Sequence, residues 1–178
     1  MPALAGLLAL HAAACRNERT AREPDSAPTW TGWTVADTGF GPVVIGMNVT
    51  EANAAIGGGL RLPAAPHTEG CDYASAPGVA GLSFMIENGR IARIDVQMAG
   101  IRTAEGAAVG DSEGRIRQLY AGRLTTSPHK YTDGHYVTVA ARQGSRGTTE
   151  LTFETDGRLV TRFRAGLLPQ VAYVEGCG

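Results

Sequence analysis

Two turn dipeptides, Asn88-Gly89 and Asp156-Gly157, each lie between runs of alternating apolar and polar residues. This arrangement is a strong local signal for a β-hairpin, because Asn, Asp and Gly tolerate the positive φ angles of a tight turn. The sequence therefore predicts hairpins over residues 81–96 and 149–163. Three positions of the first hairpin align with three of the second: Leu82, Phe84 and Arg93 match Leu151, Phe153 and Arg162.

A short helix is expected before each hairpin. Before the first, Asn48 has the position of an N-cap, Glu51 has the spacing of a capping box, and Gly57 is a helix stop. Before the second, Asp111 is expected to be the N-cap and Gly122 the stop. Each hairpin is thus predicted to follow its own helix.

The pattern predicts an α+β fold made of two tandem helix-plus-antiparallel-sheet repeats, which pack together or share a sheet. Each unit alone is too small to bury its apolar face. The first repeat is expected over residues 30–100 and the second over residues 101–178. A long β-meander is the alternative. Hydrophobic residues make up 43% of the 178 residues, which is enough for a core.

The first fifteen residues form an apolar run that ends at Cys15 and looks like a bacterial lipoprotein leader. Ala12 and Ala14 are small, as a signal peptidase requires, and Cys15 would then carry the lipid. The alternatives are an ordinary secretory signal cut after Ala14 and a buried N-terminal helix. Residues 16–29 are polar and are expected to form a tether. The leader predicts an exported protein anchored in the bilayer at the periplasmic face of the cell envelope.

The remaining cysteines are Cys71 and Cys177. An even pair in an exported protein favours a disulfide. Two buried free thiols and a metal pair are the alternatives, although the chain has no Cys-x-x-Cys motif.

The segment Ile45-Gly46-Met47-Asn48, followed by a helix that ends at Gly57 and by antiparallel strands, resembles a known fold group. It looks like the small lipoproteins of the outer-membrane assembly complex and the duplicated β-lactamase inhibitory proteins. The resemblance covers the architecture of about residues 40–165. It implies a non-enzymatic role in binding another protein, and no binding residues are transferred by it.

The densest group of polar and aromatic residues lies between Ser127 and Tyr136. A two-residue loop at Asp133-Gly134 would place His129 and His135 on opposite faces of a hairpin, whereas a three-residue loop would place both on one face, together with Tyr131. The segment predicts a structural aromatic pair, a partner or ligand surface, or a metal or catalytic site. Its candidate residues are His129, Tyr131, His135 and Tyr136.

Arginines recur along both predicted hairpins, among them Arg93 and Arg162. They predict either a basic face for an acidic partner or the solvated side of an antiparallel sheet. Trp30 and Trp33 would bind a glycan or the membrane interface if exposed, and would close a sheet edge if packed.

The formal net charge of −1 argues against nucleic-acid binding. No catalytic spacing of nucleophile and base, no metal-ligand set and no phosphate-binding loop is recognisable, so we expect no enzyme activity, no metal and no cofactor. The predicted function is that of an envelope lipoprotein that binds another envelope protein as an assembly accessory or inhibitor. A small-ligand or glycan-binding protein is the alternative, followed by a hydrolase or metal-binding protein.

Overall fold

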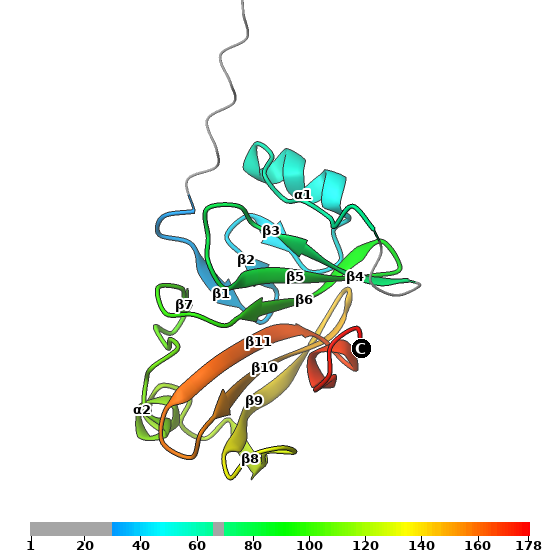
Figure 1. Ribbon diagram of the computed structural model, residues 1–178. Helices are drawn as coiled ribbons and strands as arrows, with labels where there is room; N and C mark the ends of the chain where they lie inside the picture. The colour runs from blue at the N-terminus through cyan, green and yellow to red at the C-terminus, as the bar shows by residue number, and fades with distance from the viewer. Residues whose placement is uncertain (1–29, 66–69) are drawn as a thin grey trace, which may run out of the picture.

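The computed structural model describes residues 30–65 and 70–178 (Figure 1). Cys15 and the tether of residues 16–29 lie outside the described residues. Within the described part, strands account for 44% and helices for 12%, and the strands form two sheets. The prediction of an α+β fold built from two helix-plus-sheet repeats is therefore wrong, and the fold is β-rich.

The larger sheet has seven strands in the order β4-β5-β6-β11-β10-β9-β8. Their bounds are Cys71–Ser75 (β4), Leu82–Glu87 (β5), Arg90–Val96 (β6), Val160–Leu167 (β11), Gly147–Thr155 (β10), His135–Gly144 (β9) and Leu124–Pro128 (β8). All of its neighbouring strands run antiparallel. The sheet is not one continuous meander, because β6 pairs with β11 and thereby joins the two hairpins across a long stretch of chain.

The smaller sheet has four very short strands in the order β3-β2-β1-β7. They are Val43–Val44 (β3), Gly39–Phe40 (β2), Thr34–Ala36 (β1) and Arg102–Thr103 (β7). β7 runs parallel to β1, so a segment that follows the first hairpin returns to the strands that precede it. Figure 1 shows these short strands beside the larger sheet.

The two α-helices of residues 30–65 and 70–178 are short, and this explains why the fold is not α+β. α1 (Val49–Ile56) has eight residues and α2 (Glu113–Leu119) has seven. Each buries only two side chains, so the strands supply most of the core. Neither α1 nor α2 is long and apolar enough to cross a lipid bilayer.

The predicted start and stop of α1 are confirmed. The Asn48 side chain accepts from the Glu51 backbone N–H at 2.8 Å, and the Glu51 carboxylate accepts from the Asn48 backbone N–H at 2.9 Å. Gly57 ends the helix with a φ of 77°. For α2 the predicted cap is wrong, because Ser112 is the N-cap, whereas Asp111 accepts from the Ala108 backbone N–H and from Arg115.

Both predicted hairpins are confirmed. In the first, Glu87 pairs with Arg90 across Asn88 and Gly89, whose φ angles of 50° and 76° both fall in the left-handed region. In the second, Thr155 pairs with Val160, and the loop of residues 156–159 is longer than a two-residue turn.

The core lies between the larger sheet and the layer made by the smaller sheet and the helices. Strand alternation sends one set of side chains from the larger sheet into this core. Its largest members are Phe40, Phe84, Phe153, Phe163 and Tyr120, all almost fully buried. The opposite face of the larger sheet carries mainly polar side chains, among them the buried Arg93, Glu154 and Arg164.

The predicted disulfide between Cys71 and Cys177 is confirmed. It joins β4, at one edge of the larger sheet, to the end of the chain, across a sequence separation of 106 residues. Two free thiols and a metal pair are thereby excluded.

Candidate functional site

The polar face of the larger sheet is covered in its middle by the end of the chain. We call residues 168–178 the C-terminal strap; it includes the 3-10 helix η1 (Gln170–Ala172). Figure 1 shows the strap, in red, beside β6, β11 and β10. The disulfide at Cys177 fixes one end of the strap to β4.

Glu154 is the centre of one buried charge cluster beneath the strap, and its exposed fraction is only 2%. Its carboxylate contacts the Arg164 guanidinium, Arg162 Nε at 2.6 Å and His129 Nε2 at 3.2 Å. Burial would raise the pKa of Glu154, but the charge of Arg164 and the hydrogen bond from His129 outweigh it and hold the pKa below its usual value. Arg164 also donates to the carbonyl oxygen of Val171 in the strap.

Arg93 is the centre of the second cluster and has an exposed fraction of 4%. It donates to Asp95 at 3.0 Å and to the hydroxyl of Tyr73 at 2.7 Å. It also donates to the carbonyl oxygens of Gln170 and Tyr173, at 3.0 and 2.7 Å. Burial outweighs the attraction of Arg93 and raises the pKa of Asp95.

Arg93 is buried, so it belongs neither to an exposed basic face nor to a solvated side of the sheet, the two alternatives that the sequence left open. The side chain of Arg162 is half exposed, yet it is paired with Glu154. Charged groups inside a protein persist only when they are paired and hydrogen-bonded. Arg93 thus holds the strap on the sheet directly, whereas Arg162 pairs with Glu154 and has no strap contact of its own among the described residues.

The loop between β8 and β9 is longer than either the two-residue or the three-residue loop predicted for it. Pro128 pairs with His135, and the loop of residues 129–134 is closed by a hydrogen bond from the His129 N–H to the Gly134 carbonyl at 2.9 Å. His129 lies on the polar face, where its ring stacks on Tyr136 with centroids 4.5 Å apart. His135 instead contacts Glu113 of α2 at 2.7 Å. The structure therefore does not bring the two histidines together.

Tyr131 projects from this loop and has an exposed fraction of 59%. Its hydroxyl donates to the carboxylate of Glu175 in the strap, which also binds Lys130 Nζ at 2.8 Å. The Lys130 ammonium lies 5.0 Å from the centre of the Tyr131 ring. The hydrogen bonds from Lys130 and Tyr131 lower the pKa of Glu175, so this carboxylate is charged at neutral pH.

A shallow hollow of about 330 Å³ lies beside this group and is lined by Lys130 and by strap residues that include Tyr173 and Glu175. Tyr173 is itself partly exposed. We call Lys130, Tyr131, Tyr173 and Glu175 the Tyr131 surface. His129 and Tyr136 support it from below.

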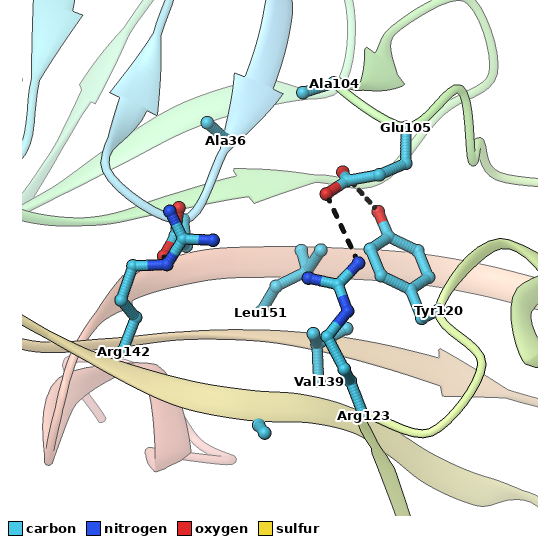
Figure 2. Close-up of a pocket in the computed structure, with 10 residues that line it drawn as sticks. Ala36, Ala104, Glu105, Tyr120, Arg123, Val139, Arg142 and Leu151 are labelled. Atoms are coloured by element: carbon cyan, nitrogen blue, oxygen red, sulfur yellow. Dashed lines mark hydrogen bonds and ion pairs between the residues drawn. The ribbon is translucent and has the colours of Figure 1, made fainter.

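A polar pocket of about 160 Å³ opens between the two sheets. Figure 2 shows Glu105 and Tyr120 pointing toward Arg123, with Arg142 on the other side of Leu151. Arg123 Nη2 lies 3.7 Å from Glu105, and Arg142 Nε lies 3.4 Å from Asp37.

The walls of this pocket are held by hydrogen bonds. The Tyr120 hydroxyl lies 2.9 Å from the Glu105 carboxylate and 2.7 Å from the Thr103 hydroxyl. Burial raises the pKa of Tyr120, so the phenol keeps its proton. The Thr149 hydroxyl donates to Asp37 at 3.2 Å.

These pocket residues were not predicted as a site. They come from five separate segments of the chain and show no short spacing that would have linked them. A β-bulge between Thr149 and Leu151 pairs Thr149 with Arg142 and Leu151 with Val139, which brings Arg142 to the core side of β9.

Trp30 and Trp33 pack together rather than standing free. Their ring centroids lie 5.3 Å apart, and both rings lie against Phe40, at 6.1 and 5.6 Å. They line a shallow hollow with Val79 and Ile101, and each remains partly exposed.

No protein-family model, curated protein or solved structure matches this chain. In residues 30–65 and 70–178, no three or more His, Cys, Asp or Glu side chains group in a way that could hold a metal ion.

Proposed function

We propose that this chain is a non-enzymatic lipoprotein of the bacterial cell envelope that binds another envelope protein through the Tyr131 surface. The observation that carries the proposal is an exposed tyrosine whose hydroxyl and ring are both held in place. The leader that ends at Cys15 supports export and anchorage in the bilayer.

Tyrosine is well suited to such a role because it offers a large, amphipathic contact area and loses little conformational entropy on binding. The contacts of Tyr131 with Glu175 and Lys130 restrict its side chain before any partner arrives. A side chain that is ordered in advance loses less entropy on association, which strengthens binding.

The strap keeps the surface in one arrangement. Glu175 lies two residues from Cys177, whose disulfide to β4 fixes the end of the chain. Arg93 fixes the strap on the other side of Glu175 through the Tyr173 carbonyl. The Tyr131 surface is thus a loop and a strap held together, with both tethered to the sheet.

A photo-crosslinking amino acid at position 132, an exposed position beside Tyr131 that leaves the tyrosine in place, tests the proposal when it is introduced in cells. We expect one discrete adduct with a single envelope protein, and its loss when Lys130 and Glu175 are both changed to Ala. The same crosslinker at Met98, which is 52% exposed and lies outside the Tyr131 surface, is the matched control. An adduct of equal yield from both positions, or none from position 132, would contradict the proposal.

A further inference from the structure

We propose that the pocket between the two sheets binds a small zwitterion, an α-amino acid with a short side chain. This site is separate from the Tyr131 surface, and the inference does not rest on the proposed protein partner. The four charged side chains of the pocket, its size and its apolar floor each point to this class of ligand.

The guanidiniums of Arg123 and Arg142 have N–H donors that can bind a ligand. Within the part of the chain that the structure describes, Arg123 and Arg142 each reach a carboxylate through one nitrogen, at 3.7 and 3.4 Å. Direct charge-assisted hydrogen bonds are shorter, at about 2.7–2.9 Å. A guanidinium carries five N–H donors, so both arginines can take a ligand carboxylate without giving up a strong bond.

The two carboxylates are held so that they can accept an ammonium group. The Glu105 oxygen Oε2 is fixed by the Tyr120 hydroxyl, which leaves Oε1 with the long contact to Arg123. Asp37 is positioned by the Thr149 hydroxyl. An ammonium group has three donors and suits this pair of acceptors.

The charges of these four side chains sum to zero, which distinguishes a zwitterion from a simple ion. A lone anion would satisfy the arginines but would approach Glu105 and Asp37 with the same sign of charge. A lone cation would satisfy Glu105 and Asp37 but would be repelled by the two arginines. A ligand with both groups complements all four side chains, and this complementarity gives specificity.

The size and the apolar floor of the pocket limit the side chain of the ligand. Its volume of about 160 Å³ is below the 300–1,000 Å³ typical of sites for drug-sized molecules. The buried side chains of Val139 and Leu151 form an apolar floor, and the small side chains of Ala36 and Ala104 leave room above it. A short aliphatic side chain fits these conditions.

The test uses the purified full-length chain and alanine, in both L and D forms, in ligand-observed NMR titrations. We expect at least one enantiomer to bind with a Kd below about 10 mM. N-acetylalanine lacks the ammonium group and alaninamide lacks the carboxylate, and each is expected to bind at least about tenfold more weakly.

Three pocket variants and one control locate the site. Glu105→Gln and Arg142→Gln are each expected to weaken alanine binding about tenfold or more. Ala104→Leu keeps every charge but fills the pocket, and it is expected to abolish binding. Arg90→Gln removes an exposed arginine that pairs with Glu51 outside the pocket, and it is expected to bind as the wild type does.

The proposal is overturned if neither enantiomer binds at about 10 mM, or if N-acetylalanine or alaninamide binds as tightly as alanine. It is equally overturned if Ala104→Leu and the two charge variants, shown to be folded by circular dichroism, retain wild-type affinity.

Discussion

Arg93 donates to the carbonyl oxygen of Tyr173 at 2.7 Å and so ties β6 to the C-terminal strap across 80 residues of sequence. The same guanidinium binds Asp95, so one buried side chain joins a strand, a carboxylate and the end of the chain. Removing it would take this donor from Asp95 and from the Tyr173 carbonyl, and would leave the Gln170 carbonyl with the Tyr173 N–H alone.

We therefore expect Arg93→Met to destabilise the protein by about 3–5 kcal/mol, because removing one partner of a buried pair leaves an uncompensated charge. The measurement is the free energy of unfolding from urea denaturation at pH 7. Arg90→Met is the control, since Arg90 lies on the same strand but has a largely exposed side chain, and a change within about 0.5 kcal/mol is expected. Equal losses from the two variants would contradict the role given to Arg93.

The two buried carboxylates are expected to respond to pH with opposite signs. The pKa of Glu154 is lowered in the folded state, so its contribution to stability is present above its unfolded pKa of about 4.5 and is lost as the pH falls below that value. The stability advantage of the wild type over Glu154→Gln should therefore shrink between pH 6 and pH 3 in urea titrations.

The pKa of Asp95 is raised in the folded state. The stability that follows from this shift is therefore present at low pH and is lost as the pH rises through the folded-state pKa of Asp95. The free energy of unfolding of Asp95→Asn should accordingly increase relative to that of the wild type as the pH rises. If the two stability differences change in the same direction with pH, the lowered pKa of Glu154 and the raised pKa of Asp95 cannot both be right.

Loss of the disulfide should loosen the strap before it unfolds the sheet. The chain-entropy relation for a loop of this length gives about 5 kcal/mol of lost stability for the double variant Cys71→Ser, Cys177→Ser. Hydrogen exchange should become faster first in residues 168–178, whose backbone bonds include Tyr173 N–H to the Gln170 carbonyl. Uniform acceleration over the whole larger sheet would indicate instead that the strap and the sheet open together.

Lipidation at Cys15 is checked by metabolic labelling with a fatty-acid analogue. The intact protein is expected to take up the label and to sediment with membranes, because several acyl chains anchor a protein stably. Cys15→Ser should lose the label. Labelling that survives this substitution would place the lipid elsewhere or show the prediction to be wrong.

The features that could be predicted from sequence are local ones. The capping box of Asn48 and Glu51 and the turn at Asn88-Gly89 each depend on a few neighbouring side chains and their allowed backbone angles. The pairing of Cys71 with Cys177 followed because only these two cysteines remain beyond Cys15.

The features that could not be predicted depend on distant contacts. The smaller sheet consists of strands of two or three residues, such as Val43–Val44, which are too short to show a period. Alternation along β6 places Arg93 on the polar face, but its burial depends on a strap that comes from the other end of the chain. The pocket depends likewise on a bulge in β9, between Arg142 and Val139, that no turn residue in the sequence indicates.

The position of Trp30 has a consequence for orientation. Figure 1 shows the first described residues beside the smaller sheet, whereas β8 and the loop that follows it lie at the far end of the larger sheet. A lipid attached upstream of Trp30 would therefore hold the molecule by one end. The loop that carries Tyr131 lies at the opposite end of the folded part from the point where such an anchor joins it.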